Sequence, residues 1–132
     1  MPKYSRTKMT KPVKPQAGEW TTLVWDSVTG DAGKEGEAYI QISPSIFSAT
    51  LTAKLTVSGA AVSTRFVERE QGNEGWENAE EYPPVEHPTT AGTTFISDSR
   101  TQSVPKGRRL ICQVKLPEGG TVEGAELNAL YF

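Results

Sequence analysis

The feature that most constrains the fold is a two-residue alternation of apolar and polar side chains in ATLTAKLTV, residues 49–57. A two-residue period places successive side chains on opposite faces, as in a β-strand with one buried face. The apolar face would carry Leu51, Ala53, Leu55 and Val57, and the polar face Thr50, Thr52, Lys54 and Thr56. The sequence therefore predicts at least one long, half-buried strand.

Several further segments have strand character, and none has a convincing helical stripe. They are rich in β-branched, aromatic or alternating residues and comprise 20–26, 37–43, 62–70, 93–99, 108–116 and 122–132. About seven short strands joined by turns that contain Gly or Pro predict an all-β protein, a single β-sandwich of jelly-roll type. The predicted core consists of Leu51, Leu55, Val57, Phe66, Leu110, Cys112, Val114 and Leu127.

The first residues differ from the rest in charge and in pattern. The stretch MPKYSRTKMTKPVKPQAG has five basic residues, three prolines and no acid, and its few apolar residues follow no repeat. We predict that residues 1–17 form an extended arm outside a β-sandwich domain of residues 18–132. Because a free end of this composition would fray, we expect another protein subunit to hold it. The predicted interface residues of the arm are Lys3, Tyr4, Arg6, Lys8, Met9, Lys11, Val13 and Lys14.

A long acidic segment, residues 71–94, is the complement of this arm. It has five acidic residues and no Lys or Arg. We predict an irregular loop with at most one helical turn, because Pro83 and Pro84 interrupt it. Charge pairing predicts that the arm of one copy contacts this segment of the next, or that a different acidic protein takes its place. The acidic interface residues are Glu74, Glu77, Glu80 and Glu81.

Two tryptophans indicate that the first strand of the domain has two apolar faces. Trp20 and Trp25 are separated by an odd number of positions, so they would lie on opposite faces of one strand. A sandwich strand needs only one apolar face. We therefore expect a loop, the arm or another subunit to cover the second face, and we assign both residues to a subunit interface.

Trp76 and Tyr82 offer an alternative binding function. Both lie in the acidic segment. Rings exposed there could stack on sugar rings, whereas buried rings would simply fill the core. A glycan is therefore the alternative partner to another protein subunit.

Few residues are suited to catalysis. His87 is the only histidine and no G-x-S-x-G motif accompanies it, so we interpret it as a solvated loop residue. Cys112 is the only cysteine, which excludes an internal disulfide. It alternates with Leu110 and Val114, so we expect an inert core thiol. We predict that the chain is not an enzyme.

Metal, cofactor, nucleic-acid and membrane binding are not expected either. The segment DSVTGDAGKEGE offers Asp26, Asp31, Glu35 and Glu37, but their spacing matches no EF-hand and a solvated turn is the simpler interpretation. A net charge of −2, from 14 basic and 16 acidic residues, disfavours a nucleic-acid partner. No apolar run approaches the roughly 18 residues of a membrane span.

The order of the segments resembles that of a known class of proteins. A basic N-terminal stretch leads into GEWTTLVWD, followed by ATLTAKLTV, VSTRFVERE, TTAGTTFISDS, KGRRLICQVKL and a last strand ending in NALYF. Over most of residues 18–132 this is similar to the small β-rich minor tail proteins of long-tailed phages that infect actinobacteria. The resemblance implies a jelly-roll-like structural subunit of the virion, located in the tail, that contacts other virion proteins and forms homo-oligomers.

Two alternatives to a minor tail protein stay open. Small head-decoration proteins share the size and the extended N-terminal arm, so the resemblance also fits a capsid decoration protein. A carbohydrate-binding module at the tail tip, which would bind a host-surface glycan through Trp76 and Tyr82, is the alternative from a different class.

Overall fold

A computed structural model describes residues 3–30, 36–41, 45–104 and 107–131 of the 132-residue chain. Within these residues the regular secondary structure consists of β-strands. The strands are β1 (Lys3–Met9), β2 (Thr21–Thr22), β3 (Ser27–Thr29), β4 (Tyr39–Gln41), β5 (Ser45–Val57), β6 (Val62–Gly72), β7 (Gly75–Glu81), β8 (Val85–His87), β9 (Gly92–Val104), β10 (Arg109–Lys115) and β11 (Thr121–Tyr131). No helix that could cross a membrane occurs in these ranges.

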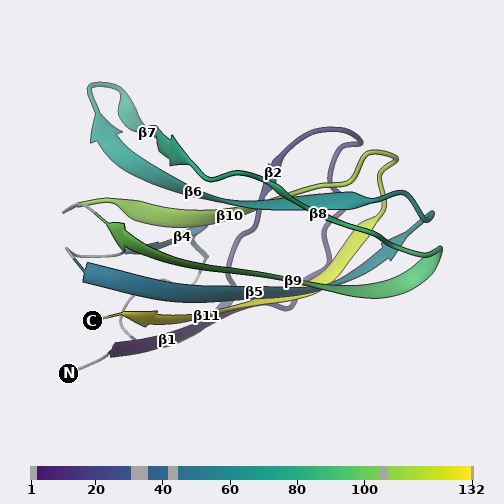
Figure 1. The fold of residues 1–132 in the computed structure, drawn as a ribbon, viewed down its shortest axis with the longest axis horizontal. Coiled ribbons are helices and arrows are strands. Elements are labelled where there is room, and N and C mark those ends of the chain that lie inside the picture. Colours follow the sequence, from purple (N-terminus) through teal and green to yellow (C-terminus); the bar gives the residue numbers. More distant parts are fainter. Residues whose placement is uncertain (1–2, 31–35, 42–44, 105–106, 132) are drawn as a thin grey trace.

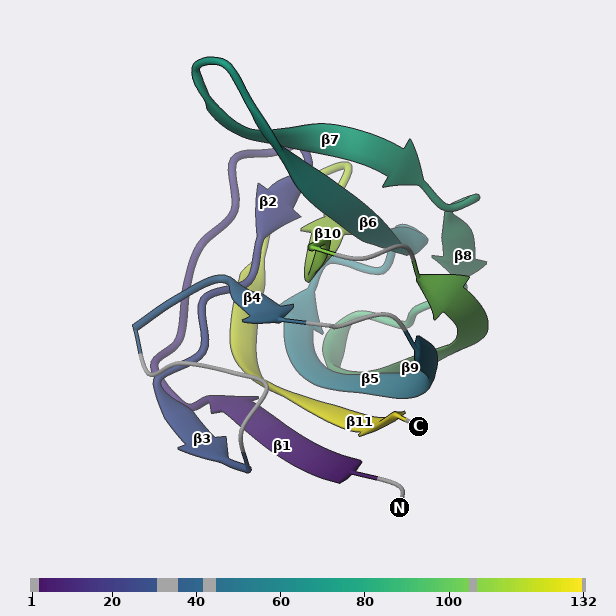
Figure 2. The ribbon, with the colours of Figure 1, turned by 90° about the vertical axis from the view of Figure 1, so that its left-hand side faces the viewer.

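The strands form two sheets that pack face to face (Figure 1). Sheet A has five strands in the order β3-β1-β11-β5-β9, and sheet B has the order β2-β10-β6-β7. In sheet B, β4 also pairs with β10, and β8 also pairs with β6. Figure 2, which looks along the sandwich, shows the two layers separately, with β1, β11 and β5 in one and β10, β6 and β7 in the other. The predicted all-β sandwich is confirmed.

The core lies between the sheets and follows the predicted alternation. β5 pairs with β11 on one side and with β9 on the other. Its inward residues Leu51, Leu55 and Val57 are buried, and its outward residues Thr52 and Lys54 are exposed. All eight residues predicted as core are buried. Each such side chain contributes about 1.5–3 kcal/mol through the apolar surface it removes from water.

The N-terminal segment is a strand of sheet A and not an arm, so this prediction was wrong. β1 pairs with β11 along its whole length and with β3 on its other side. Ser5, Thr7 and Met9 point into the sandwich and are buried, whereas Tyr4 and Arg6 are exposed. A two-residue alternation was therefore present, but small polar residues occupy two of its inward positions. The predicted boundary after residue 17 consequently divides one sheet.

The chain beyond β1 is held by the same domain. Val13 forms an isolated bridge with Val122 through backbone hydrogen bonds of 3.0 and 2.8 Å. Asp26 accepts hydrogen bonds from the hydroxyl of Thr10, at 2.7 Å, and from its backbone N–H, also at 2.7 Å. The hydroxyl contact is the largest cause of a lowered pKa for the Asp26 carboxyl. This carboxylate therefore fixes the end of β1 in its charged form.

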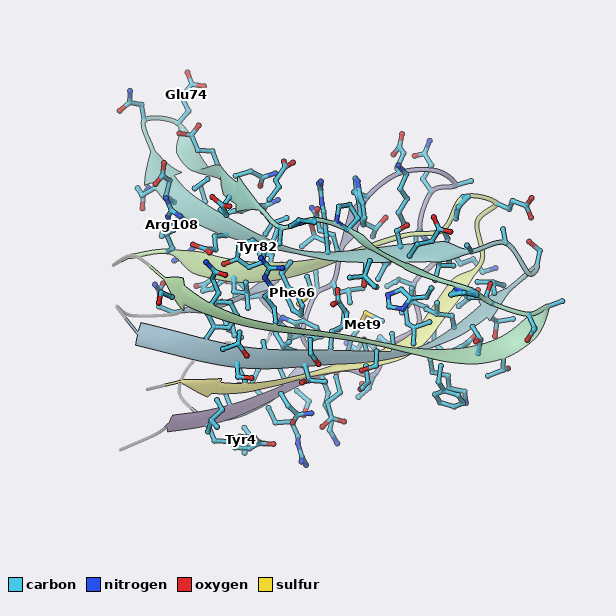
Figure 3. The ribbon with its side chains drawn as sticks, viewed as in Figure 1. Tyr4, Met9, Phe66, Glu74, Tyr82 and Arg108 are labelled. Atoms are coloured by element: carbon cyan, nitrogen blue, oxygen red, sulfur yellow. The ribbon has the colours of Figure 1, made fainter. Side chains whose placement is uncertain are left out.

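The acidic segment also differs from its prediction. It is no irregular loop, because it contains β7 and β8, which pair with the two ends of β6. The predicted helical turn is strand β7. The β6–β7 hairpin extends beyond the sandwich and carries Glu74 at its tip (Figure 3). Gly75 has a φ of 123°, which side-chain-bearing residues rarely adopt, so a glycine allows the chain to reverse there.

Candidate functional site

The outer face of sheet A is rich in hydroxyl groups. On β5 and β9 these hydroxyls pair across the strands, with Thr50 Oγ1 3.0 Å from Ser99 Oγ, and Thr101 Oγ1 donating to Ser48 Oγ at 3.2 Å. Phe95 projects from this face with 74% of its surface exposed. Among the residues that the structure describes, it is the most exposed large apolar side chain. An exposed ring of this size on a face of short polar side chains marks a candidate contact surface.

A shallow depression lies beside Phe95. It forms where a β-bulge between Val122 and Gly124 shifts the register of β11 against β5. Gly124 contributes no side chain that would fill it. The depression is lined by Thr52, Ala53, Lys54, Phe95, Gly124, Ala125 and Glu126. One patch therefore combines a projecting ring, a hollow, and one side chain of each charge.

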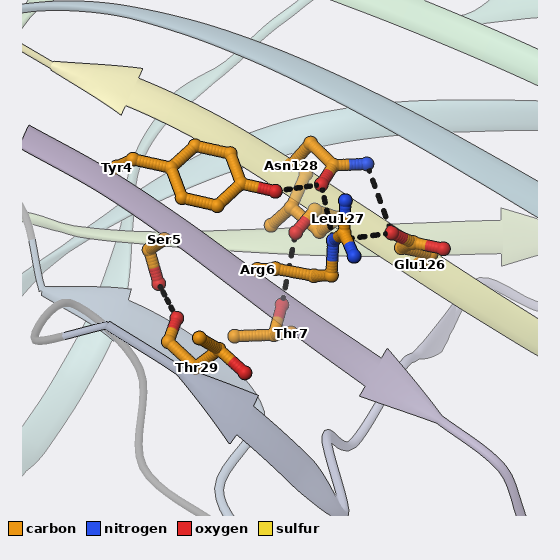
Figure 4. Close-up of polar contacts among 8 residues, drawn as sticks. All are labelled: Tyr4, Ser5, Arg6, Thr7, Thr29, Glu126, Leu127 and Asn128. Carbon is orange, nitrogen blue, oxygen red and sulfur yellow. Dashed lines mark hydrogen bonds and ion pairs between the residues drawn. The ribbon is translucent and has the colours of Figure 1, made fainter.

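β1 adds a polar cluster to the same face (Figure 4). The Tyr4 hydroxyl donates to Asn128 Oδ1 at 2.8 Å, and Arg6 Nε lies 3.1 Å from the same oxygen and 2.8 Å from Glu126 Oε1. Tyr4 and Arg6 were predicted to contact another subunit, but here they tie β1 to β11 of their own chain. Met9, predicted as an apolar anchor for a partner, is buried in the core.

The predicted pairing between the basic arm and the acidic segment is wrong, because β1 is fixed inside sheet A and cannot extend to another copy. Glu81 instead pairs with Arg65 of its own chain at 3.3 Å. Glu74, Glu77 and Glu80 are exposed on the β6–β7 hairpin. Of the other predicted arm residues, Lys11, Val13 and Lys14 are exposed, Lys8 is half-buried, and the side chain of Lys3 lies outside the described residues.

The two tryptophans assigned to an interface are covered by their own chain. Trp25 is fully buried in the core, and its backbone N–H donates to the Glu37 carbonyl at 2.9 Å. Trp20 is half-buried on the outer face of sheet B, where the Arg65 guanidinium lies 4.3 Å from its ring centre. The predicted strand over residues 20–26 is reduced to β2 and one isolated bridge. No second subunit is needed to cover this region.

Tyr82 is not available to a sugar, so its assignment to a glycan site is wrong. It is 2% exposed, and its hydroxyl donates to Glu68 Oε2. Glu68 is itself buried and forms an ion pair with Arg108 at 3.0 Å. The hydrogen bond to Glu68 raises the pKa of the Arg108 guanidinium. This buried charged cluster holds one end of sheet B and carries no free surface for a ligand.

Trp76 lies on the outer face of sheet B, together with residues that the sequence reasoning missed. The Arg109 guanidinium carbon is 3.7 Å from the Trp76 ring centre and 3.8 Å from that of Tyr39. Arg109 Nε donates to Gln41 Oε1 at 3.2 Å. The alternation in RLICQVK, in which Leu110, Cys112 and Val114 face inward, could have placed Arg109 on this face. The approach of β4 to β10 has no signal in the sequence.

His87 was predicted as a solvated loop residue, but it is half-buried in β8. Thr64 Oγ1 donates to Asp98 Oδ2 at 2.8 Å and lies 2.7 Å from His87 Nε2, so this nitrogen carries the proton that Thr64 accepts. Burial lowers the pKa of His87, and Asp98 acts in the opposite direction. Thr64 is fully buried, so this network joins the two sheets rather than offering a nucleophile.

Cys112 is a buried free thiol in the core, as predicted, and burial raises its pKa. A high pKa keeps the thiol protonated and unreactive. Of the acidic turn considered for a metal, Asp31 and Glu35 lie outside the described residues, and Asp26 binds Thr10. No cluster of three or more potential metal ligands is found in the part of the chain that is described.

Comparison with known proteins identifies the fold and no family. The chain matches no protein-family model and no curated protein. Its structure superposes on the globular domain of the zebrafish complement 1qA protein with a TM-score of 0.66 and 10% identity, covering 96% of this chain and 94% of that one. The sandwich is a jelly roll. This confirms the fold class predicted from the sequence.

Two further solved structures agree with this topology. Murine APRIL at pH 8.0 superposes with a TM-score of 0.67 and 9% identity, covering 98% of this chain and all of that one. The Eiger TNF of S. frugiperda gives a TM-score of 0.65 and 7% identity, covering all of this chain and 92% of that one. At such low identity the likeness establishes the fold alone.

Proposed function

We propose that this chain is a non-catalytic structural subunit that assembles with copies of itself through the outer face of sheet A. The patch around Phe95 carries this proposal. It holds a projecting ring, a hollow at Gly124, and Lys54 near Glu126, whose carboxylate is already paired with Arg6. A second copy can therefore place its ring in the hollow of the first, so that the ring supplies most of the attraction.

The rest of the face favours burial in such a contact. The hydroxyls of Thr50 and Ser99, and those of Thr101 and Ser48, already bond to one another. Polar groups with partners lose little when water is removed, whereas unpaired groups are costly to bury. Burial of Phe95 would add about 1.5–3 kcal/mol per copy.

We assign this assembly to a phage virion, in the tail rather than on the capsid surface. Support comes from the resemblance of the strand segments to minor tail proteins of actinobacterial phages. The face of sheet A takes over the docking role first given to the N-terminal arm. A capsid decoration protein stays the alternative. Mass spectrometry of gradient-purified particles should find the chain in intact virions, and its restriction to the host-cell fraction would contradict the assignment.

Size-exclusion chromatography with light scattering tests the assembly. The wild-type chain should elute as a multiple of the 14.4 kDa monomer, and Phe95→Asp should elute as the monomer. Val24→Asp is the matched control, because Val24 is 46% exposed but lies outside the strands of both sheets, and it should assemble like the wild type. A monomeric wild-type chain, or an unchanged mass for Phe95→Asp, would refute self-assembly through this face.

A further inference from the structure

The outer face of sheet B carries three aromatic rings beneath cationic side chains. Trp20 lies under Arg65, with 4.3 Å between the guanidinium carbon and the ring centre, and near Lys115 Nζ at 5.5 Å. Tyr39 and Trp76 lie on the two sides of Arg109, at 3.8 and 3.7 Å. All three rings are half-buried, so each is held by the sheet and still reaches the surface.

Arg109 is pre-organised for an anion. Contacts with two rings and a hydrogen bond from Nε to Gln41 hold the guanidinium in place. Its Nη1 and Nη2 groups have no hydrogen-bond acceptor among the described residues. A fixed guanidinium end of this kind can bind both oxygens of a carboxylate with little loss of side-chain entropy.

Positive charge exceeds negative charge on this face, where the cations Arg65, Arg69, Arg109 and Lys115 outnumber the acids Glu81 and Glu86, although the chain as a whole has a net charge of −2. Arg65 is paired with Glu81. For Arg69, Arg109 and Lys115, by contrast, no carboxylate of the described residues lies within ion-pair distance. Neutral amide side chains lie beside the arginines of this face and accept hydrogen bonds from them: Gln41 from Arg109, Asn78 from Arg69, and Gln113, which lies between Arg109 and Lys115 on β10, from Arg65.

We propose that this face binds an acidic polysaccharide whose carboxylates are separated by neutral sugar units. Arg109 and Lys115 lie six residues apart on β10, about 20 Å along a strand. Two carboxylates with this spacing could pair with Arg109 and Lys115. The hydroxyl groups of the sugars between them could form hydrogen bonds with the neutral amides. The edges of Trp20 and Trp76 would contact the apolar faces of the sugar rings.

The same features disfavour two other kinds of polymer. A nucleic acid carries a phosphate at every nucleotide, so its closely spaced charges would meet Glu74, Glu77 and Glu80 of the adjoining β6–β7 hairpin, where a polysaccharide with one carboxylate per disaccharide can place neutral sugars instead. An acidic peptide in extended form gains most from the free edge of a sheet, whereas these residues lie on a face. A polysaccharide with widely spaced carboxylates has no such dense charge and needs no free sheet edge.

Binding can be measured with a hyaluronan oligosaccharide, which carries one carboxylate per disaccharide. Trp20 and Trp76 report on the face by fluorescence, and calorimetry gives the dissociation constant. We expect saturable binding that weakens as salt is added. Arg109→Gln and Trp76→Ala should each weaken it about tenfold or more, and Arg109→Lys, which keeps the charge without the fork, should weaken it less.

Lys11→Gln is the matched control. Like Arg109→Gln it removes one positive charge, but from an exposed side chain in the segment between β1 and β2, so it should change the affinity by less than about twofold. Equal weakening by Lys11→Gln would show non-specific charge attraction and overturn the proposal. So would equal affinity for a neutral chitin oligosaccharide, tighter binding of single-stranded DNA or poly-glutamate of the same charge, or no binding at about 1 mM. Self-assembly through Phe95 is measured separately and can fail without affecting this result.

Discussion

The two outer faces of the sandwich are built on the same alternating strands but differ in the side chains they present. On sheet A, short hydroxyl side chains pair with one another beside the ring of Phe95, the most exposed large apolar side chain of this face. On sheet B, long cationic side chains lie over rings that are themselves half-buried, as Arg109 does over Trp76. The first face has an exposed ring beside a hollow, with its cations not held over rings apart from Arg6, whereas the second holds arginines in place over aromatic rings.

This difference shows how one small domain can divide two kinds of contact between its layers. Burial of hydroxyls that already bond to one another costs little desolvation free energy, so this surface can pack against an identical surface. Cations held on a surface can bind an anion only if a ligand can reach them, and burying them without a partner would cost desolvation free energy. We therefore assign self-assembly to sheet A and ligand binding to sheet B.

The largest effect should follow removal of the strand that supports the face of sheet A. Deleting residues 2–16 takes away β1 from between β3 and β11, together with the buried Met9. The truncated chain should lose its cooperative thermal unfolding transition, measured by circular dichroism. Tyr4→Ser, which removes an exposed ring and its hydrogen bond to Asn128 but keeps the strand, should keep the transition. A folded truncated chain would restore the idea of a separable N-terminal arm.

Substitutions at adjacent positions of β5 should separate the core from the face. Leu55→Ala should lower the free energy of unfolding by about 2–5 kcal/mol, because Leu55 is fully buried. Lys54→Gln, one residue away on the exposed side, should change it by less than about 0.5 kcal/mol. Urea denaturation measures both, and similar values for the two variants would contradict the register of β5.

Two adjacent arginines should have separate roles in sheet B. Arg108→Gln leaves the buried Glu68 carboxylate with Tyr82 as its main partner, so we expect a loss of about 2–4 kcal/mol in the free energy of unfolding. Arg109→Gln should cost less than about 1 kcal/mol, since its guanidinium lies on the outer face. Chemical denaturation measures both free energies of unfolding. A larger loss for Arg109→Gln than for Arg108→Gln would show that the contacts of Arg109 with Trp76 and Tyr39 stabilise the fold.

The smallest effect should be a pH dependence of stability from His87. Burial lowers the pKa of His87 below the usual 6.5. Below pH 6.5 His87 therefore binds a proton more readily in the unfolded chain than in the folded chain. The contribution of His87 to stability is therefore complete above pH 6.5 and declines as the pH falls through that value. Comparing the wild type with His87→Asn at several pH values isolates it. A wild type that gains stability over the variant on acidification would contradict the direction.

The sequence predicted those elements whose side chains alternate by polarity. β5 and β10 were found because Leu51, Leu55 and Leu110 alternate with polar residues. β1 was missed because Ser5 and Thr7 face the core and conceal the pattern. The hairpin of β6 and β7 was missed because its exposed strand carries acidic residues that are also typical of loops.

The candidate sites depended on tertiary contacts that have no local signal. Trp76 was predicted to be available for binding, but its partners Tyr39 and Arg109 come from strands far away in the sequence. The hollow beside Phe95 depends on a β-bulge in β11, which the alternation does not reveal. Charge counting placed the interface on the N-terminal residues because it took no account of their pairing in a sheet.

Sedimentation velocity with a labelled hyaluronan oligosaccharide tests the division between the two faces most directly, because it reports assembly and binding in one experiment. We predict that Phe95→Asp sediments as a monomer and still carries the oligosaccharide, whereas Arg109→Gln assembles like the wild type and leaves the oligosaccharide unbound. If either substitution abolished both assembly and binding while the protein stayed folded, the two faces would not act separately and the account would be contradicted.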